Sequence, residues 1–266
     1  MQSEVIILIP FYENELGLIN SINSIQEDFS VDLMIVDDGS IDEPLPIDTM
    51  NQVYKDRGTI IYEVLPENRG IEIALNTGLL KIIELNYKYI ARLDCGDVFH
   101  KNKLNKQLNY LKNKTEVKLL GTWADIKDDR DNLLYTEKHP ISYKEIKKKM
   151  YLNTTFIHPS VVFESSILSD IGLYPLDYPA AEDYAFFMNI VKKYRSENYP
   201  EVLMDYLIDP NSISSLKRQR QVKSRIKGIL KNYYIGWYPT YGLIRNVLLL
   251  LISRKMSNKL KSILKK

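Results

Sequence analysis

The chain of 266 residues is 45% hydrophobic and 26% charged, which excludes collagen-like, low-complexity and globally disordered proteins. Its 36 basic and 34 acidic residues nearly cancel, but every acidic residue lies at or before Asp209. From Lys217 to Lys266 there are 14 basic and no acidic residues, which leaves 22 basic and 34 acidic residues in the first 216. An acidic body with a basic tail predicts different roles for the two parts.

The compartment is predicted from the cysteine content and the apolar runs. A single cysteine, Cys95, excludes an internal disulfide framework and a cysteine-based zinc site, and it fits a reducing compartment. The first residues lack the basic region of a secretory signal. The longest purely apolar run, Val247–Ile252, is far shorter than the roughly 20 residues that cross a bilayer. We therefore expect a cytoplasmic protein.

The first half alternates short apolar runs with segments of helical spacing. Strands are expected at 5–9, 33–36, 59–64 and 89–93, and helices at 15–29 and 71–85. Strands separated by helices predict an α/β fold with right-handed crossovers and a mostly parallel central sheet, covered by helices on both faces.

After residue 97 the alternation becomes less regular. Helices are expected at 101–112, 142–152 and 182–194, strands at 118–124, 160–163 and 202–208, and a hairpin turn at 128–132. The clearest change of composition falls near Ser215. We therefore expect one domain over residues 1–215 and a basic helical tail over residues 216–266.

Three predicted strands end in residues that suit a binding site. Pro10–Glu13 follows the first strand, Asp37–Ser40 the second and Asp94–Asp97 the fourth. Parallel strands would bring these clusters to one edge of the sheet, where α/β proteins bind ligands. The converging carboxylates would repel each other unless a divalent cation, held with substrate phosphates, compensates. Each cluster alone is also a common turn sequence, and Cys95 suits a small filler better than a nucleophile.

Other motifs narrow the chemistry. The glycine-rich loops of dinucleotide oxidoreductases and P-loop enzymes are absent from the sequence. His158 precedes a strand, where it could contact phosphate, act catalytically or be satisfied by the backbone. Glu182 and Asp183 open a predicted helix, where acidic residues favour the helix dipole but could also supply a general base.

Five motifs in order resemble family 2 glycosyltransferases with a GT-A fold. They are Val5–Tyr12 with Ser21–Gln26 and Met34–Asp42; Glu67–Gly70 with Leu75–Gly78; Ile90–Asp97 with Lys103, Leu104 and Gln107; His158–Val161; and Ala181–Tyr184. The resemblance covers roughly residues 4–210. It implies a Rossmann-like GT-A domain with a nucleotide-sugar half over residues 1–98 and an acceptor half over residues 99–215.

The resemblance also implies site residues. Asp38 would accept a hydrogen bond from uracil N3, which favours a UDP-sugar donor. Asp183 would be the general base of an inverting transfer, and Glu182 would help to place the acceptor. The donor would lie against Pro10, Phe11, Tyr12, Glu13, Asp38, Asn68, Arg69, Gly70, Arg92, Asp94, Cys95 and Gly96, with His158 nearby.

The resemblance implies Mn²⁺ or Mg²⁺ beside the diphosphate, but two positions depart from the family. The third residue of the family's Asp-Ala-Asp-Asp motif ligates the metal, and here it is Gly96. Asp94 or Asp97 would then take over, or the metal is held weakly or is dispensable. The arginine that often stands seven residues after the general base is replaced by Ile190.

The basic tail has three interpretations. Basic residues around Tyr233–Tyr241 and a short apolar stretch are typical of an element at an anionic membrane surface, where lipid-linked acceptors lie. Alternatively, the tail packs on the domain with its charges solvated. Nucleic-acid binding ranks last, because the acidic body would repel the same backbone.

We therefore expect a glycosyltransferase that extends a surface polysaccharide or lipid-linked glycan, at the inner face of the cell membrane and without a nucleic-acid partner. A nucleotidyltransferase is the rival enzyme, but it requires a glycine-rich loop after the first strand, where Pro10–Glu13 stands. A non-catalytic subunit that binds nucleotide sugar or glycan is the other rival, and Gly96 is the feature that supports it.

Overall fold

The computed structural model describes residues 3–208 and 218–251. Its strands are β1 (Val5–Phe11), β2 (Asp32–Asp37), β3 (Ile60–Val64), β4 (Tyr89–Arg92), β5 (Val98–Phe99), β6 (Val117–Lys127), β7 (Leu133–Glu137), β8 (Val162–Glu164) and β9 (Arg195–Leu207). The helices are α1 (Glu15–Asn23), α2 (Ile47–Val53), α3 (Ile71–Glu84), α4 (Lys103–Asn113), α5 (Tyr143–Lys149), α6 (Leu168–Ile171), α7 (Glu182–Lys193), α9 (Arg218–Lys231) and α10 (Trp237–Leu251). Two short 3₁₀ turns, η1 (His158–Ser160) and η2 (Ser165–Ile167), flank β8.

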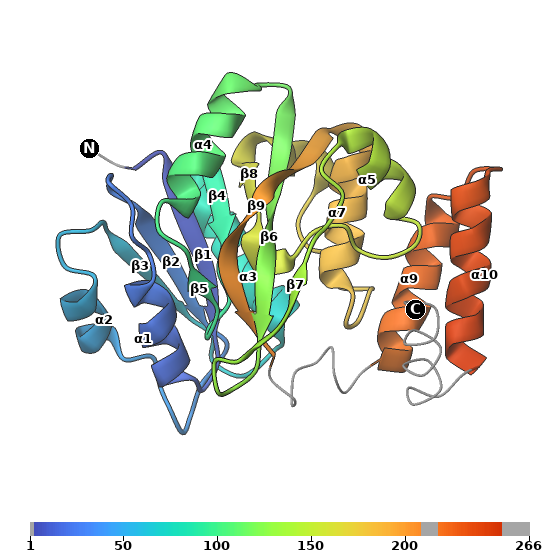
Figure 1. The fold of residues 1–266 in the computed structure, drawn as a ribbon. Helices are drawn as coiled ribbons and strands as arrows, with labels where there is room; N and C mark the ends of the chain where they lie inside the picture. Colours follow the sequence, from blue (N-terminus) through green and yellow to red (C-terminus); the bar gives the residue numbers. More distant parts are fainter. Residues whose placement is uncertain (1–2, 209–217, 252–266) are drawn as a thin grey trace.

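All nine strands form one sheet in the order β3-β2-β1-β4-β8-β6-β9-β5, with β7 paired to β6 (Figure 1). The first four strands in this order are parallel, as the alternating sequence predicts. In the second half β8 runs antiparallel to both β4 and β6, whereas β6 and β9 are parallel. The carboxyl ends of β1, β2 and β4 therefore lie at one edge of the sheet, as expected for a GT-A fold.

Two apolar layers cover the two faces of the sheet. On one face α1, α2 and α4 pack over Val5, Ile7 and Ile9. On the other face α3, α5 and α7 pack over Ile6 and Leu8. Burial on both faces explains why β1 reads as a continuous apolar run instead of an alternating one.

The largest differences from the sequence prediction are two boundaries and one additional helix. Helix α1 ends at Asn23, and the Arg57 side chain donates to the carbonyls of Ile22 and Ile25 around this end at 2.6 and 2.8 Å. Strand β9 begins at Arg195 rather than Val202, since its pairing with β6 continues past Pro200 through a shift in register. Helix α2 was not expected; of its side chains only Met50 is buried, so it shows little apolar periodicity.

Two buried polar residues of α4 tie this helix to η1. Lys103 Nζ donates to Gln107 Oε1 at 2.7 Å and to the Ser160 carbonyl at 3.1 Å, and Gln107 Nε2 donates to the same carbonyl at 3.0 Å. The Lys103 side chain is fully buried, which lowers its pKa to about 7. These two motif residues therefore act structurally, by fixing the segment that carries His158.

The buried lysine makes a prediction about stability and pH. The unfolded chain binds a proton at Lys103 up to about pH 10.5, but the folded chain only up to about pH 7, so this residue's contribution to folding improves as pH rises between these values. Relative to Lys103→Met, the wild type should gain about 1–3 kcal/mol in the free energy of unfolding between pH 7 and pH 9.5. Urea titrations at the two pH values measure this. Lys106→Met, on the same helix but partly exposed, is the control, and an equal pH response in all three proteins would contradict the prediction.

The C-terminal helices pack on the body beside α7 (Figure 1). Helix α9 buries Val222, Gly228 and Ile229, and its Ser224 donates to the Pro179 carbonyl at 3.0 Å. Helix α10 lies on the segment after α5, where Arg245 donates to the Leu152 carbonyl at 2.7 Å. In the described residues no helix is long and apolar enough to cross a membrane. The expected boundary near Ser215 and the basic end at 252–266 lie outside the described residues.

A substitution at Gly242 would test the close packing of α10 on the segment after α5. A Cβ atom at this position would lie 2.0 Å from the carbonyl oxygen of Tyr151, so Gly242→Ala should force the helix away from the body. We expect a loss of about 1–3 kcal/mol in the free energy of unfolding, with faster proteolysis of the C-terminal helices. Val247→Ala, at an exposed position of the same helix, is the matched control. If both variants had the wild-type melting temperature and cleavage rate, the close packing would be wrong.

Candidate functional site

A cleft of about 570 Å³ opens where the end of β4 meets the second half of the chain. The segments 153–159 and 180–183 form part of its wall, together with side chains from β6, β7, β9 and α9. Four carboxylates border this cleft: Asp94, Glu137, Glu182 and Asp183. The structure thus brings together four predicted site residues from three distant parts of the sequence: Asp94, His158, Glu182 and Asp183.

Glu182 and Asp183 form the first turn of α7, beside the cleft. Burial and the neighbouring Asp183 carboxylate raise the pKa of Glu182 to about 8, and its Oε2 has no hydrogen-bond partner among the described residues. Burial also raises the pKa of Asp183, although its Oδ1 accepts a hydrogen bond from the Tyr184 amide at 2.6 Å. A carboxylate with a raised pKa is a stronger base, so this pair can do more than stabilise the helix dipole.

Asp94 lies at the end of β4 and pairs with a cation inside the sheet. The Arg92 side chain is fully buried and donates to the Leu8 carbonyl and to Asp94 Oδ1. The second oxygen of Asp94 has no partner in the part of the chain that the structure describes. This carboxylate is therefore fixed in direction and keeps one oxygen for a ligand.

The other candidate metal ligand, Asp97, does not border the cleft. It is 3% exposed, and its Oδ1 accepts a hydrogen bond from the Leu207 amide at 2.9 Å. Burial and the Asp94 charge raise its pKa well above the ordinary range. Asp97 thus joins the acidic loop to β9, and only Asp94 of the two expected ligands faces the cleft.

Gly96 adopts a backbone conformation that other residues rarely take, with φ at +99°. Its amide donates to Ser21 Oγ at 2.9 Å, which holds the loop against α1. An aspartate at this position would be strained even though the neighbouring space is open. Among the described residues no three His, Cys, Asp or Glu side chains form a metal cluster. The residues fit a divalent cation only as Asp94 plus diphosphate oxygens, a mode that Mg²⁺ commonly uses.

The nucleotide side of the predicted site lies at the ends of β1 and β2. Both oxygens of the buried Asp38 carboxylate accept backbone hydrogen bonds at 2.9 Å, one from Arg69 and one from Gly70. Gly39 allows the same close approach, since a Cβ atom there would lie 2.2 Å from the carbonyl carbon of Glu67. Asp38 therefore holds the segment that carries the exposed residues Asn68 and Arg69.

The loop after β1 is held by hydrogen bonds between side chains and backbone groups. Glu13 Oε1 accepts hydrogen bonds from the amides of residues 41 and 42, both at 3.3 Å. Phe11 is in the core, whereas Tyr12 is 46% exposed and available to a ligand. The Cys95 thiol donates to the Pro10 carbonyl at 3.3 Å, and burial raises its pKa, as suits a filler and not a nucleophile.

His158 borders the cleft as a neutral side chain. Its Nε2 shares a hydrogen bond of 2.8 Å with the Tyr174 hydroxyl, and its ring meets Phe187 edge-on. Burial, together with the Arg92 charge, lowers its pKa to about 3. His158 can therefore orient a ligand by hydrogen bonding but carries no charge near neutral pH.

The structure adds site residues that the sequence prediction missed. Gln221 of α9 lines the cleft, and Arg225 of the same helix donates through Nη1 to Asn153, another lining residue. The Nε of Arg225 is buried without a partner among the described residues, and the Arg225 charge counteracts the rise in the pKa of Asp183. Arg225 is thus a cation that the tail brings to this pair of acids, and the basic run was its only sequence signal.

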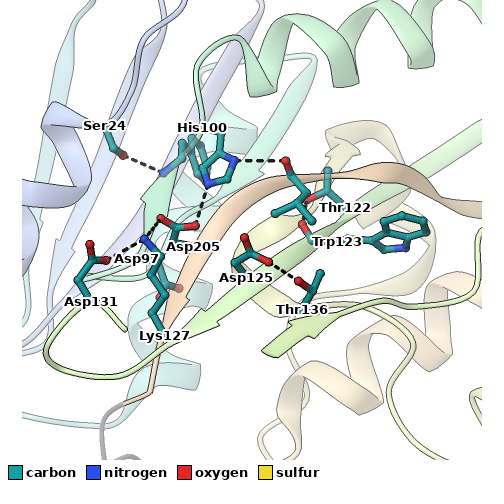
Figure 2. Close-up of polar contacts among 12 residues, drawn as sticks. Ser24, Asp97, His100, Thr122, Trp123, Asp125, Lys127, Asp131, Thr136 and Asp205 are labelled. Carbon is teal, nitrogen blue, oxygen red and sulfur yellow. Dashed lines mark hydrogen bonds and ion pairs between the residues drawn. The ribbon is translucent and has the colours of Figure 1, made fainter. Parts of the chain in front are cut away.

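A polar network braces the wall of the cleft (Figure 2). Lys127 Nζ lies 2.8 Å from carboxylate oxygens of both Asp131 and Asp205. Asp205 also contacts His100 Nε2 at 2.8 Å, and Thr136 links β7 to β6 through Asp125 at 2.6 Å. These contacts fix the ends of β6, β7 and β9, which supply lining residues Ile126, Tyr135 and Tyr206.

Several curated proteins are similar to this chain. Bifunctional glycosyltransferase pgtA of Dictyostelium discoideum is 29% identical over 208 residues, which are 66% of this chain but only 27% of pgtA. The amylovoran biosynthesis glycosyltransferase AmsE of Erwinia amylovora is 26% identical, over 74% of this chain and 71% of AmsE. An Escherichia coli UDP-Gal:alpha-D-GlcNAc-diphosphoundecaprenol beta-1,3-galactosyltransferase is 25% identical, over 64% and 60% of the two chains.

Solved structures share the fold at low identity. TarS of S. aureus in complex with UDP-GlcNAc has a TM-score of 0.67 at 16% identity, over 93% of this chain and 72% of that chain. The mannosyltransferase PcManGT from Pyrobaculum calidifontis, in complex with GDP-Man and Mn²⁺, has a TM-score of 0.65 at 17% identity, over 95% and 71%. The family model described as glycosyl transferase family 2 matches residues 6–172. The chain therefore belongs to glycosyl transferase family 2.

Proposed function

We propose that this glycosyltransferase transfers a hexose from a UDP-sugar to a hydroxyl of a glycan or lipid-linked acceptor, with inversion, in the synthesis of a surface polysaccharide. The observation that carries the proposal is the Glu182–Asp183 pair, which lines the same cleft as Asp94. The name of AmsE supports a role in polysaccharide synthesis. The name of the E. coli galactosyltransferase and the UDP-GlcNAc complex of TarS support a UDP-sugar donor.

The proposed chemistry assigns different tasks to the carboxylates of the cleft. Asp183 takes the proton of the acceptor hydroxyl as that oxygen attacks the anomeric carbon, and Glu182 positions the acceptor. The bond to the diphosphate breaks on the opposite side, so a single displacement inverts the configuration without a protein nucleophile. A divalent cation between Asp94 and the diphosphate would stabilise the negative charge of the leaving group.

The location of the enzyme is part of the same proposal. A lipid-linked acceptor lies at the membrane surface, so we place the enzyme in the cytoplasm with peripheral contact to the inner face of the membrane. The E. coli relative supports this, because its name specifies a diphosphoundecaprenol acceptor. No role in nucleic-acid binding is proposed.

Asp183→Asn provides the test of the proposed base. It should lower kcat by about 10²–10⁴-fold, because the amide cannot accept the acceptor's proton, and leave the affinity for UDP unchanged. UDP release with acceptor and calorimetric UDP binding measure the two quantities. Asp170→Asn, at an exposed position that pairs with Lys193, is the control. Full activity of Asp183→Asn would exclude Asp183 as base, and a wild type that binds UDP-sugar but never releases UDP would favour the non-catalytic subunit.

Arg225 provides a second test, through the pH profile. Its positive charge favours the deprotonated form of Asp183, so Arg225→Gln should raise the pKa of this base further. The acidic limb of the plot of kcat against pH should then move to higher pH, with activity recovering as pH rises. Lys227→Gln, which removes an exposed charge two residues away, is the control. Superimposable acidic limbs in all three proteins would contradict the assignment.

A further inference from the structure

A second cavity, of about 640 Å³, lies outside the catalytic cleft between α5, α7 and the junction of α9 with α10. Its rim carries five lysines and no acidic residue: Lys144, Lys147, Lys148, Lys192 and Lys231. We call it the lysine pocket. Its charge is opposite to that of the catalytic cleft, and the mechanism proposed above does not use it.

The positive charge of the lysine pocket is mostly uncompensated. Among the described residues only Lys148 of the five has a carboxylate within 4 Å, Glu145 at 3.5 Å. Lys147 and Lys192 are exposed and come from two different helices, so their charges converge on one opening. Such a concentration of cations favours an anionic ligand.

The floor of the lysine pocket is apolar. Met188 and Val191 of α7 form part of it, and both are buried. The rings of Tyr151 and Tyr234 meet edge-to-face beside them, with centroids 5.5 Å apart. A basic rim over an apolar floor suits an amphiphile with an anionic head and a hydrocarbon part better than a fully polar polyanion.

An apolar stripe on α10 begins close to the lysine pocket. Tyr233 and Tyr234 line the pocket and lead into α10, the outermost helix at this end of the molecule (Figure 1). The stripe consists of side chains spaced alternately four and three residues apart, all at least 45% exposed: Trp237, Tyr241, Ile244, Leu248 and Leu251. This spacing places them on one face of the helix, as in helices that lie in a membrane interface.

We infer that the lysine pocket binds the phosphate of an anionic phospholipid and so brings the α10 stripe into the adjoining leaflet. The inference rests on the proposed membrane location and names the residues that would provide it. It also assigns most of the basic contact to the body instead of the tail, which supplies only Lys231 among the five lysines. Lys227 pairs with Asp177 and Arg245 with a backbone carbonyl, whereas α5 and α7 supply most of the pocket's lysines.

Vesicle flotation tests this inference with matched charge reversals. The full-length protein should bind vesicles of phosphatidylcholine with phosphatidylglycerol, and should not bind phosphatidylcholine alone. Lys147→Glu/Lys192→Glu should weaken this binding at least about 30-fold, at about 1 kcal/mol for each lysine lost. Lys55→Glu/Lys101→Glu has the same net charge but changes exposed turn residues outside the lysine pocket, so it should bind within about threefold of wild type. The fluorescence of Trp237 should shift to the blue only when vesicles bind.

Three results would overturn the inference: no binding of wild type to the anionic vesicles, equal weakening by both double variants, or thermal stabilisation by inorganic phosphate without vesicle binding. Loss of a dimer in Lys147→Glu/Lys192→Glu, measured by sedimentation without lipid, would instead assign the pocket to self-association. Transfer to a water-soluble acceptor is the separate readout for the proposed function. Both double variants should retain it, so a failure of lipid binding with intact transfer would count against this inference alone.

Discussion

The crowding of carboxylates in one cleft is the constraint on which the rest of the structure depends. Asp94, Glu182 and Asp183 border the same cleft, and their burial raises the pKa of the last two. The repulsion in such a site is relieved by protonation of the acids and by nearby cations. Arg92 is such a cation inside the sheet, and Arg225 is one on the C-terminal helix. Both halves of the fold and the tail therefore contribute charged residues to the same cleft, and their charges must balance there.

Local patterns predicted the parts of the fold that depend on local burial. Val5–Ile9 reads as a strand because both of its faces are covered, and Glu182 marks a helix start because acidic residues suit that position. Asp97 shows where such reasoning ends. It was a candidate ligand from its motif, but the Leu207 amide, 110 residues later in the chain, binds its carboxylate in the interior. Contacts of this kind depend on strand pairing, which no local pattern specifies.

Arg225 escaped prediction for the same reason, and it changes the meaning of the charge asymmetry. The tail was expected to locate the enzyme at a membrane surface. Its α9 helix, however, supplies Gln221 to the cleft wall, and Arg225 of this helix bonds to Asn153 and, through its charge, counteracts the rise in the pKa of Asp183. The tail therefore contributes to the wall of the cleft as well as to the proposed location of the enzyme. The basic helix α5 likewise belongs to the body but rims the lysine pocket.

Without a carboxylate at Gly96, a divalent cation at the cleft would depend on the donor itself. A diphosphate beside Asp94, as proposed above, would bring more negative charge to a cleft whose Arg92 is already engaged by that carboxylate and whose His158 is neutral. On the proposed nucleotide side the segment of the exposed Arg69 is held in place through Asp38, and among the described residues no carboxylate bonds to the Arg69 side chain. With Gly96 in the loop, Asp94 is the one cleft carboxylate of the acidic motif left to share a cation with the donor. Such a cation would be held mainly by the donor's own phosphates, so its binding and that of the donor should be mutually dependent.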